Sequence, residues 1–191
     1  MTREEFLRLA RVHPVAAAIK AEEDWTPALE SRACLLFARH GDAFALEPLV
    51  EQAHARGKGV VAHLDLLAGI GKDRAGLAYL RQIGLDAVIT SRPSLVGLAR
   101  AEGLLTIQPL LLTEELALTS SIRQIAQAQP DLIEVLPGII FPDFARTVCA
   151  LLPGPFIAGG FIRTPQEVAR LLATGCVLIS SSARQLWQAA A

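Results

Sequence analysis

The sequence predicts a TIM-type (β/α)8 parallel barrel of the α/β class, with an N-terminal helix and short loops, built by residues 1–191 as a single domain. Short apolar runs alternate with helical segments along the whole chain, and no low-complexity linker separates two regions. The runs number eight, which favours closure into a barrel. They repeat about every 23 residues, so the connecting loops must be short. A doubly wound open sheet is the alternative topology.

The predicted strands are short, nearly continuous in apolar residues, and bounded by Gly, Pro or Asp. This pattern is typical of parallel strands that are buried on both faces. In chain order, the strands are expected at residues 15–20, 33–39, 60–65, 87–91, 104–108, 132–136, 156–160 and 177–181.

The predicted helices have recognisable ends. In three of them a glycine follows the last periodic residue and can cap the helix: 73–83 before Gly84, 93–102 before Gly103, and 165–174 before Gly175. Thr164 is a suitable N-cap, and Pro165 suits the first helical position. The first crossover, 21–32, is short and contains Pro27, so we expect its helix to be stunted.

Composition narrows the class of protein. A hydrophobic fraction of 52% and a mean hydropathy of +0.39 exclude a disordered chain. No uncharged apolar run reaches the length of about 18 residues that a membrane helix needs, so we expect no membrane contact. The N-terminus is charged and helix-like, unlike a signal peptide, which predicts a cytoplasmic protein. The apolar content is compatible with a homo-oligomer, although a compact barrel can bury it internally.

Charge argues for local rather than global recognition of anions. Lys and Arg total 18 against 19 Asp and Glu, so the net charge is −1. A strongly basic domain would hold nucleic acid through its overall field, and this chain lacks such a field. Any anion must therefore be bound by a specific group of residues.

The cysteines and most of the histidines carry no evident chemistry. The three cysteines are scattered in apolar runs without a CxxC motif, so we expect small buried residues in a reducing compartment: Cys34, Cys149 and Cys176. Three histidines lie in helix or loop contexts and are expected at the surface: His13, His40 and His54. We expect no metal site, because no third ligand accompanies His63 and Asp65 at a recognisable spacing.

Polar residues gather where the predicted strands end. These ends are Lys20, His63 with Asp65, Thr90-Ser91-Arg92, Gln108, Glu134, Gly159-Gly160 and Ser180-Ser181-Ser182, whereas the strand beginnings are apolar. Functional sites of such barrels lie at the carboxyl ends of the strands. The asymmetry therefore predicts that this rim carries the function.

A phosphate site is predicted after the last two strands. The loops that follow strands 7 and 8 often bind phosphate in these barrels, through main-chain amides. Gly159 and Gly160 would let an anion approach the backbone closely. Ser181 and Ser182 would add hydroxyls and free amides before a final helix. A tight turn and a helix cap are the simpler explanation of either element taken alone.

Four further residues are candidates for the rest of a ligand. Lys20 either faces solvent or binds a phosphate or hydroxyl group, and nothing supports a Schiff base. His63 and Asp65 alternate on one strand, so both can point into the mouth and hydrogen-bond a polyol. Glu134 either contacts Lys20 or a ligand hydroxyl, or forms an internal ion pair that stabilises the barrel.

Other motifs give weaker indications. The loop 66–73 contains Gly69 and Gly71 but matches neither a dinucleotide-binding nor a Walker A motif, so we interpret it as a flexible lid or ligand loop. No nucleophile elbow with a Ser–His–Asp arrangement occurs, which argues against a hydrolase, and we assign no catalytic residue.

Several strings resemble one family, the glycerol uptake operon antiterminator regulators. They are AAIK (17–20), HLDLLAGIGKD (63–73), ITSR (89–92), GLLTIQ (103–108), PDLIEVLPG (130–138), IAGGFI (157–162) and SSSARQLW (180–187). The resemblance implies a cytoplasmic barrel, not an enzyme, that needs no cofactor, binds glycerol-3-phosphate and acts on leader mRNA to prevent transcription termination. It also implies that Gly159, Gly160, Ser181 and Ser182 hold the phosphate. Lys20, His63, Asp65 and Glu134 would then surround the glycerol end.

The chain departs from the family pattern after its fifth strand. Where the family usually has an Arg after the strand-5 Gln, this chain has Pro109, followed later by Thr113-Glu114-Glu115. The difference weakens either ligand or RNA contact at that rim. Any RNA surface would have to be a patch of arginines, with Arg74, Arg81, Arg92 and Arg163 as candidates.

Three hypotheses of different classes follow. The first is a glycerol-3-phosphate-responsive regulator of antitermination that acts on leader mRNA. The second is an isomerase or aldolase acting on a small phosphorylated metabolite, with Glu134, His63 and Asp65 as acid/base groups. The third is a sensor of the same ligand that signals through a protein partner. Residue chemistry alone leaves these open, because a fold does not fix a function.

Overall fold

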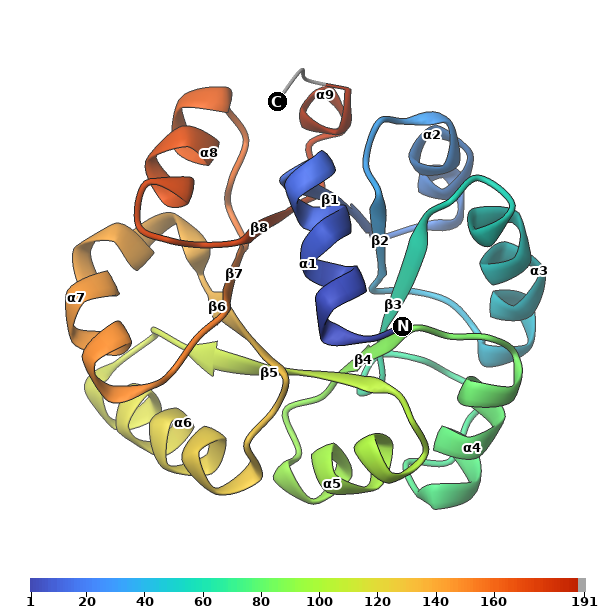
Figure 1. Ribbon diagram of the computed structural model, residues 1–191, viewed down its shortest axis with the longest axis horizontal. Helices are drawn as coiled ribbons and strands as arrows, with labels where there is room; N and C mark the ends of the chain where they lie inside the picture. The colour runs from blue at the N-terminus through green and yellow to red at the C-terminus, as the bar shows by residue number, and fades with distance from the viewer. Residues whose placement is uncertain (189–191) are drawn as a thin grey trace.

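The computed structural model describes residues 1–188, and its strands form a closed parallel barrel in the order β1 to β8 (Figure 1). The barrel closes because β1 pairs with β8 in parallel, with Ala17 opposite Ser181. This pairing confirms the predicted (β/α)8 class and rules out the open sheet.

The strands lie close to the predicted positions, although β3 ends two residues before its predicted end and β5 continues three residues beyond it. They are β1 (Val15–Ile19), β2 (Leu35–Ala38), β3 (Gly59–His63), β4 (Ala87–Ile89), β5 (Leu105–Leu111), β6 (Leu132–Leu136), β7 (Phe156–Gly159) and β8 (Leu178–Ser181). The helices are α1 (Arg3–Val12), α2 (Trp25–Glu30), α3 (Ala43–His54), α4 (Arg74–Gln82), α5 (Pro93–Ala101), α6 (Glu115–Ala128), α7 (Phe141–Leu151), α8 (Pro165–Leu172) and α9 (Arg184–Trp187). Two short 3₁₀ turns, η1 (Glu22–Asp24) and η2 (Gly138–Ile140), precede α2 and α7.

The helix ends confirm the signals in the sequence. Three glycines that lie two or three residues beyond the ends of α4, α5 and α8 have φ angles of 86°, 77° and 92°, in the left-handed region that favours glycine: Gly84, Gly103 and Gly175. Thr164 accepts from the Glu167 amide, and the Glu167 side chain accepts from the Thr164 amide, which completes a capping box. The first crossover is indeed stunted, since α2 has only 6 residues after η1.

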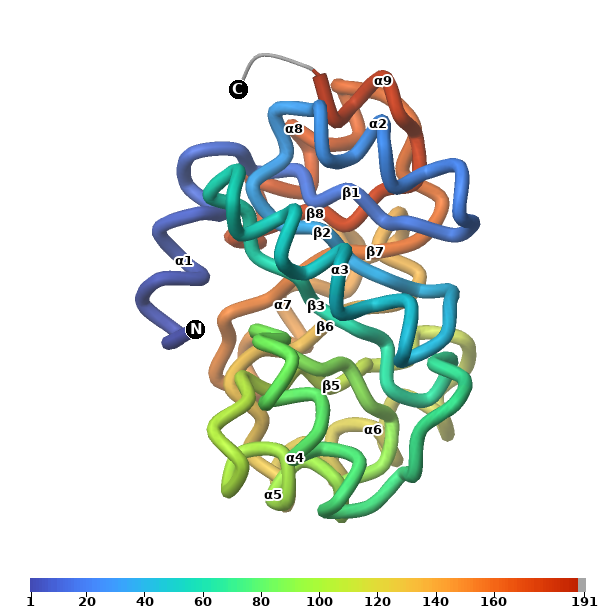
Figure 2. Tube along the Cα trace, turned by 90° about the vertical axis from the view of Figure 1, so that its right-hand side faces the viewer, coloured from blue at the N-terminus to red at the C-terminus, as the bar shows by residue number. Residues whose placement is uncertain are grey.

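Helix α1 lies across the N-terminal end of the barrel (Figures 1 and 2). It buries Phe6, Leu9 and Ala10 in the same cluster as Leu35 and Phe37, which belong to the inner core of the barrel. A second apolar cluster fills the space between the strands and the outer helices. The barrel is therefore open at one end only, the carboxyl end of the strands.

Two expectations about single residues are wrong. His13 is buried, not at the surface, because it ends α1 and its Nδ1 lies 2.8 Å from the Val15 carbonyl. Cys149 is exposed, because it lies on the outer face of α7 beside the buried Val148. Cys176 is buried as expected, whereas Cys34 is only partly covered.

Within residues 1–188, the structure contains no helix that is both long enough and apolar enough to span a bilayer.

Candidate functional site

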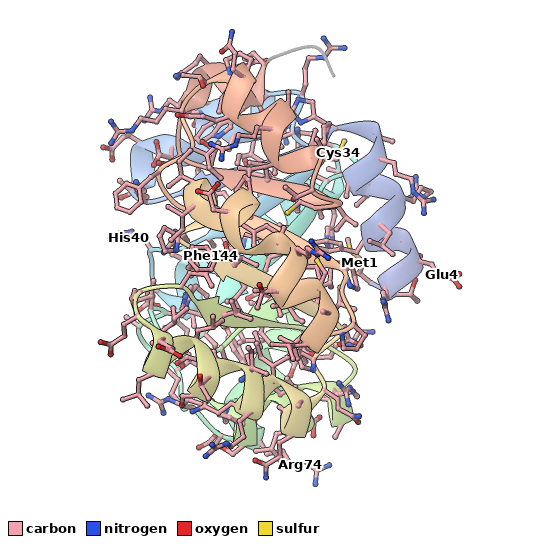
Figure 3. The ribbon with its side chains drawn as sticks, turned by 90° about the vertical axis from the view of Figure 1, so that its left-hand side faces the viewer. Met1, Glu4, Cys34, His40, Arg74 and Phe144 are labelled. Carbon is pink, nitrogen blue, oxygen red and sulfur yellow. The ribbon has the colours of Figure 1, made fainter. Side chains whose placement is uncertain are left out.

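A cavity of about 840 Å³ opens at the carboxyl ends of the strands. The residues that line it come from the ends of β1, β2, β3 and β5 to β8 and the loops that follow: Ala18, Lys20, Arg39, Leu66, Leu111, Thr113, Leu136, Pro137, Gly160, Phe161, Ile162, Arg163, Ser180, Ser181, Ser182, Ala183 and Gln185. Figure 3 shows this end of the molecule, marked by His40 and Phe144, opposite the end where α1 presents Glu4. The cavity therefore occupies the rim that the polar strand ends predict.

The turns after β7 and β8 meet at this cavity. The Ser181 hydroxyl donates a hydrogen bond of 2.7 Å to the Ile162 carbonyl and accepts one of 3.1 Å from the Ala183 amide. The two turns are thus tied together by Ser181, whose hydroxyl is already engaged. The predicted convergence of the two turns is present, with Ser181 as the group that joins them.

Free main-chain amides border the cavity at the same place. Gly160 and Phe161 both have left-handed backbone, with φ of 89° and 61°. Within the described chain, the amides of Gly160, Phe161 and Ser182 donate to no protein group. Such exposed amides can bind an anion, as they do at helix N-termini.

Gly159 has a different part from the one predicted. A Cβ at this position would lie 2.5 Å from Glu134 Oε1 and 3.1 Å from Leu136 Cδ2. The absence of a side chain here leaves room for the Glu134 carboxyl, and Gly159 does not line the cavity.

Three cations line the cavity: Lys20, Arg39 and Arg163. In the described part of the chain none of them forms an ion pair with a carboxylate. The described lining residues include no Asp or Glu. Like-charged groups in a recess attract an oppositely charged ligand strongly, so the cavity is suited to a small anion.

Arg39 was missed from the sequence, although a signal was available. The register places Ile19 opposite Ala38, so Lys20 and Arg39 follow adjacent strands at the same level. The signal was a basic residue directly after each of two neighbouring strands. This pattern places both side chains at one site.

Below the cavity lies a buried acidic group, Glu134, with 2% of its surface exposed. Burial raises its pKa to about 7, although the Arg39 guanidinium and the neighbouring Ser180 hydroxyl favour the charged form. Glu134 Oε1 and Ser180 Oγ have no hydrogen-bond partner of good geometry in the described chain. Among the described residues, Glu134 forms an ion pair neither with Lys20 nor with another cation. The carboxyl is thus available to a ligand or a proton.

His63 and Asp65 are not equivalent in the structure. Burial and the nearby Arg39 lower the pKa of His63, which favours neutral imidazole, and its buried Nδ1 has no partner among the described residues. Asp65 instead accepts from the Ser91 amide (2.7 Å) and hydroxyl (2.9 Å), with Arg92 Nε at 3.4 Å. Neither residue lines the cavity.

The Asp65 carboxylate fixes the loop after β4. Burial alone would raise its pKa, but hydrogen bonds from Ser91 and Thr90 hold it below the usual value. Lys72 similarly fixes the 66–73 loop by donating to the Leu64 carbonyl and, at 2.6 Å, to the Leu67 carbonyl. Of this loop only Leu66 lines the cavity, and its role as a lid stays a prediction.

A metal centre is not supported by the geometry. Among residues 1–188, no three His, Cys, Asp or Glu side chains are grouped so that they could hold a metal ion. The groups at the cavity are suited to an anion: amides and cations at the mouth, with a protonatable carboxyl beneath.

Comparison with solved structures agrees with the fold. A glycerol uptake operon antiterminator regulatory protein from Listeria monocytogenes is 31% identical, with a TM-score of 0.84 over 91% of this chain and 94% of that one. An antiterminator-related protein from Thermotoga maritima is 25% identical, with a TM-score of 0.80 over 92% and 98%. Aldolases at 10% and 12% identity share the fold alone, with TM-scores of 0.70 and 0.67.

Sequence comparison gives the family. The chain is 28% identical over 182 residues, 95% of both chains, to the uncharacterized protein YgcP of Escherichia coli. The family model described as glycerol-3-phosphate responsive antiterminator matches residues 15–187, from the first strand to the last helix. The chain therefore belongs to the glycerol-3-phosphate responsive antiterminator family.

Proposed function

We propose that this protein binds glycerol-3-phosphate in the cavity and, in response, regulates transcription antitermination by acting on the leader mRNA of glycerol-utilisation genes in the cytoplasm. The observation that carries the ligand part is the lining: three cations without a carboxylate among the described residues, beside two turns with free amides. Family membership supports the regulatory part.

The phosphate is assigned to the turns after β7 and β8. The amides of Gly160, Phe161 and Ser182 supply donors there, and Lys20 and Arg163 supply charge. Charge-assisted hydrogen bonds of this kind are roughly twice as strong as neutral ones. A phosphate dianion would also offset the repulsion among the cations, which lack carboxylate partners.

The glycerol hydroxyls are assigned to the inner part of the cavity. Ser180 Oγ lines it, and Glu134 Oε1 lies beneath with no hydrogen-bond partner in the described chain. A hydroxyl can donate to a carboxylate or accept from a protonated carboxyl, so Glu134 can serve the ligand in either state. His63, deeper on β3, supports this end with neutral imidazole.

Calorimetric titration tests the ligand part directly. We expect saturable binding of glycerol-3-phosphate and none of glycerol at the same concentrations, because glycerol lacks the group that the cations and amides attract. Arg163→Ala should weaken binding, whereas Arg146→Ala, an exposed arginine of α7 outside the cavity, should not. Saturable binding of neither compound would refute the proposal.

Transcription in vitro tests the regulatory part. A template with a leader terminator should give more read-through when the protein and glycerol-3-phosphate are both present than with either alone. Unchanged read-through with a protein that binds the ligand would favour signalling through a protein partner instead.

The buried Glu134 supports a second candidate, an isomerase or aldolase acting on a small phosphorylated metabolite. A carboxyl with a pKa near 7 next to an anion site has the properties of a general acid or base. Turnover of triose phosphates that is abolished in Glu134→Gln would establish this activity. Absence of turnover, with binding intact, would leave the regulator.

A further inference from the structure

The closed end of the barrel carries arginines that form no ion pair within the described chain. Seven exposed arginines belong to this end: Arg3, Arg8 and Arg11 on α1, Arg32 before β2, and Arg56, Arg81 and Arg100 at the ends of α3, α4 and α5. None of them pairs with a carboxylate of the described chain. The arginines that do form such pairs are Arg74, Arg92, Arg170 and Arg184. We call these seven residues the arginine face.

Topology places the arginine face together. Strands begin and outer helices end at the N-terminal end of a parallel barrel, and α1 lies across that end, toward the viewer in Figure 1. Helices α4 and α5 contact each other, and α5 contacts α6. The exposed carboxylates nearest to these arginines in sequence are fewer: Glu4, Glu5, Glu30 and Glu51. Of these, Glu5 is engaged by the Thr2 amide at 2.6 Å.

Helix capping explains only part of this arrangement. Cations are favourable at helix C-termini, and Arg56 and Arg100 donate to the carbonyls of Gln52 and Gln129 near helix ends. Arg3, however, begins α1, where a cation opposes the helix dipole. Arg8 lies in the middle of α1, and Arg32 lies outside any helix. Arg3 also donates a hydrogen bond of 3.4 Å to the Gly154 carbonyl, which ties α1 to the loop before β7, so capping leaves Arg8 and Arg32 to be explained.

We propose that the arginine face binds the phosphate backbone of RNA. The inference rests on the proposed function, in which the protein acts on leader mRNA, and it adds the surface involved. Guanidinium groups suit this partner because they bind phosphate oxygens with two parallel hydrogen bonds and stay charged. Helix α1 presents Arg8 and Arg11, one turn apart, on the side away from its buried Phe6, Leu9 and Ala10.

The open end is less suited to a long polyanion. The cations there without an ion pair in the described chain line the cavity, whereas exposed carboxylates without an ion pair lie on the elements that follow β1 and β5: Glu22, Glu23, Glu114 and Glu115. These carboxylates repel an RNA backbone laid across the rim, while a small dianion can pass between them into the cavity. The charge pattern therefore separates ligand and RNA at opposite ends.

Paired charge reversals test the proposal. We would compare Arg8→Glu/Arg11→Glu with a matched control, Arg123→Glu/Arg146→Glu, whose arginines are exposed on α6 and α7 and lack ion pairs within the described chain. The probe is a labelled RNA hairpin with a G·C-rich stem and a uridine tail, titrated at several KCl concentrations with glycerol-3-phosphate present. Circular dichroism melting would show that each variant is folded.

The arginine-face pair should bind the RNA at least about tenfold more weakly at low salt. The slope of log K against log salt should flatten by roughly 0.7 to 0.9 for each phosphate group that the variant no longer binds. The control pair should keep most of the affinity and the slope. Both pairs should bind glycerol-3-phosphate like the wild type, because none of these arginines lines the cavity.

Other outcomes would overturn the arginine face, and they separate it from the proposed function. If both double variants lose the same RNA affinity, binding depends on the net charge of the protein and not on the arginine face. If the wild type binds RNA and the arginine-face pair binds as well, the surface lies elsewhere and the regulatory function stands. If the wild type binds no RNA, both the face and the mRNA part of the function fail, while calorimetry decides the ligand part independently. If the arginine-face pair changes only the sedimentation of the protein and not its RNA binding, the arginine face is an interface between copies of the chain.

Discussion

At the scale of single residues, the molecule contains one carboxyl whose environment sets it apart. Several other carboxyls, among them Asp24 and Asp65, have pKa values below the usual one because hydrogen bonds favour their charged forms. Glu134 has the opposite shift, from 4.5 to about 7, because it is almost fully buried without a hydrogen-bonded partner in the described chain. Its protonation state therefore changes near neutral pH, where the others stay charged.

This shift predicts how stability depends on pH. Between the unfolded value of 4.5 and the folded value of about 7, the native state keeps a proton that the unfolded state has lost, so stability falls as pH rises. The loss amounts to about 3 kcal/mol and is complete above the folded pKa. Urea unfolding across this range should show the slope in the wild type and in Glu47→Gln, an exposed control, but not in Glu134→Gln. The same pH dependence in the wild type and in Glu134→Gln would contradict the raised pKa of Glu134.

Arg39 and Asp65 should separate binding from stability. Arg39 lines the cavity without an ion-pair partner among described residues, so Arg39→Ala should weaken glycerol-3-phosphate binding at least about tenfold and leave unfolding nearly unchanged. Asp65→Asn should do the reverse, because it weakens the hydrogen bonds to Ser91 that hold the β4 loop, at a cost of about 1 to 3 kcal/mol. Calorimetry and urea unfolding of both variants measure the two effects. If Asp65→Asn weakened glycerol-3-phosphate binding as much as Arg39→Ala, Asp65 would contact the ligand.

At the scale of elements, the site depends on how two turns are joined. The turns after β7 and β8 have no shared secondary structure beyond Gly159 and Ser180, where the strands pair. The Ser181 hydroxyl extends that pairing by bonding to Ile162. The groups that we propose to bind the ligand on both turns are thus positioned by one side chain.

Ser181→Ala should therefore loosen the site. The buried Ile162 carbonyl loses its donor, so we expect a loss of about 1 to 3 kcal/mol in the free energy of unfolding and weaker binding of glycerol-3-phosphate. Ser182→Ala is the matched control, because its hydroxyl has no hydrogen bond in the described chain and its removal should leave stability unchanged. Urea unfolding and calorimetry provide both readouts. Equal stability of the two variants would show that the Ser181 bond contributes nothing.

Elements were more predictable than the contacts between them. The eight strands could be placed from the sequence because burial on both faces leaves a continuous apolar run, and glycines mark the helix ends. Asp65 was assigned to the mouth by strand alternation, but β3 ends at His63 and the chain then turns toward Ser91. The space that Gly159 leaves for Glu134 depends on pairing between β6 and β7, which no local pattern shows.

At the scale of the whole molecule, the two ends of the barrel differ in shape and charge. One end is filled by α1 and bordered by arginines, and the other is open, with cations inside and carboxylates around it. The chain as a whole has a net charge of −1, so this polarity is invisible in the composition. The net charge led us to expect only local recognition of anions. The fold shows that the charged residues are distributed unequally between the two ends.

The role of α1 in this arrangement can be measured. Phe6 is fully buried in the inner core, so Phe6→Ala should cost about 3 to 5 kcal/mol, as other large-to-small core changes do. Val12→Ala, on the same helix but 61% exposed, should cost less than about 0.5 kcal/mol. Urea unfolding compares the two. A small loss for Phe6→Ala would mean that α1 is a peripheral attachment and not part of the barrel core.

Because α1 closes one end of the barrel, a small molecule can enter and leave the barrel only through the open end. The residence time of the ligand, and with it the duration of any response, is then decided by the loops at that open end. Leu66 and Phe161 are two exposed side chains at the entrance of the cavity. Shortening either side chain should speed dissociation of the ligand without removing the groups that bind it.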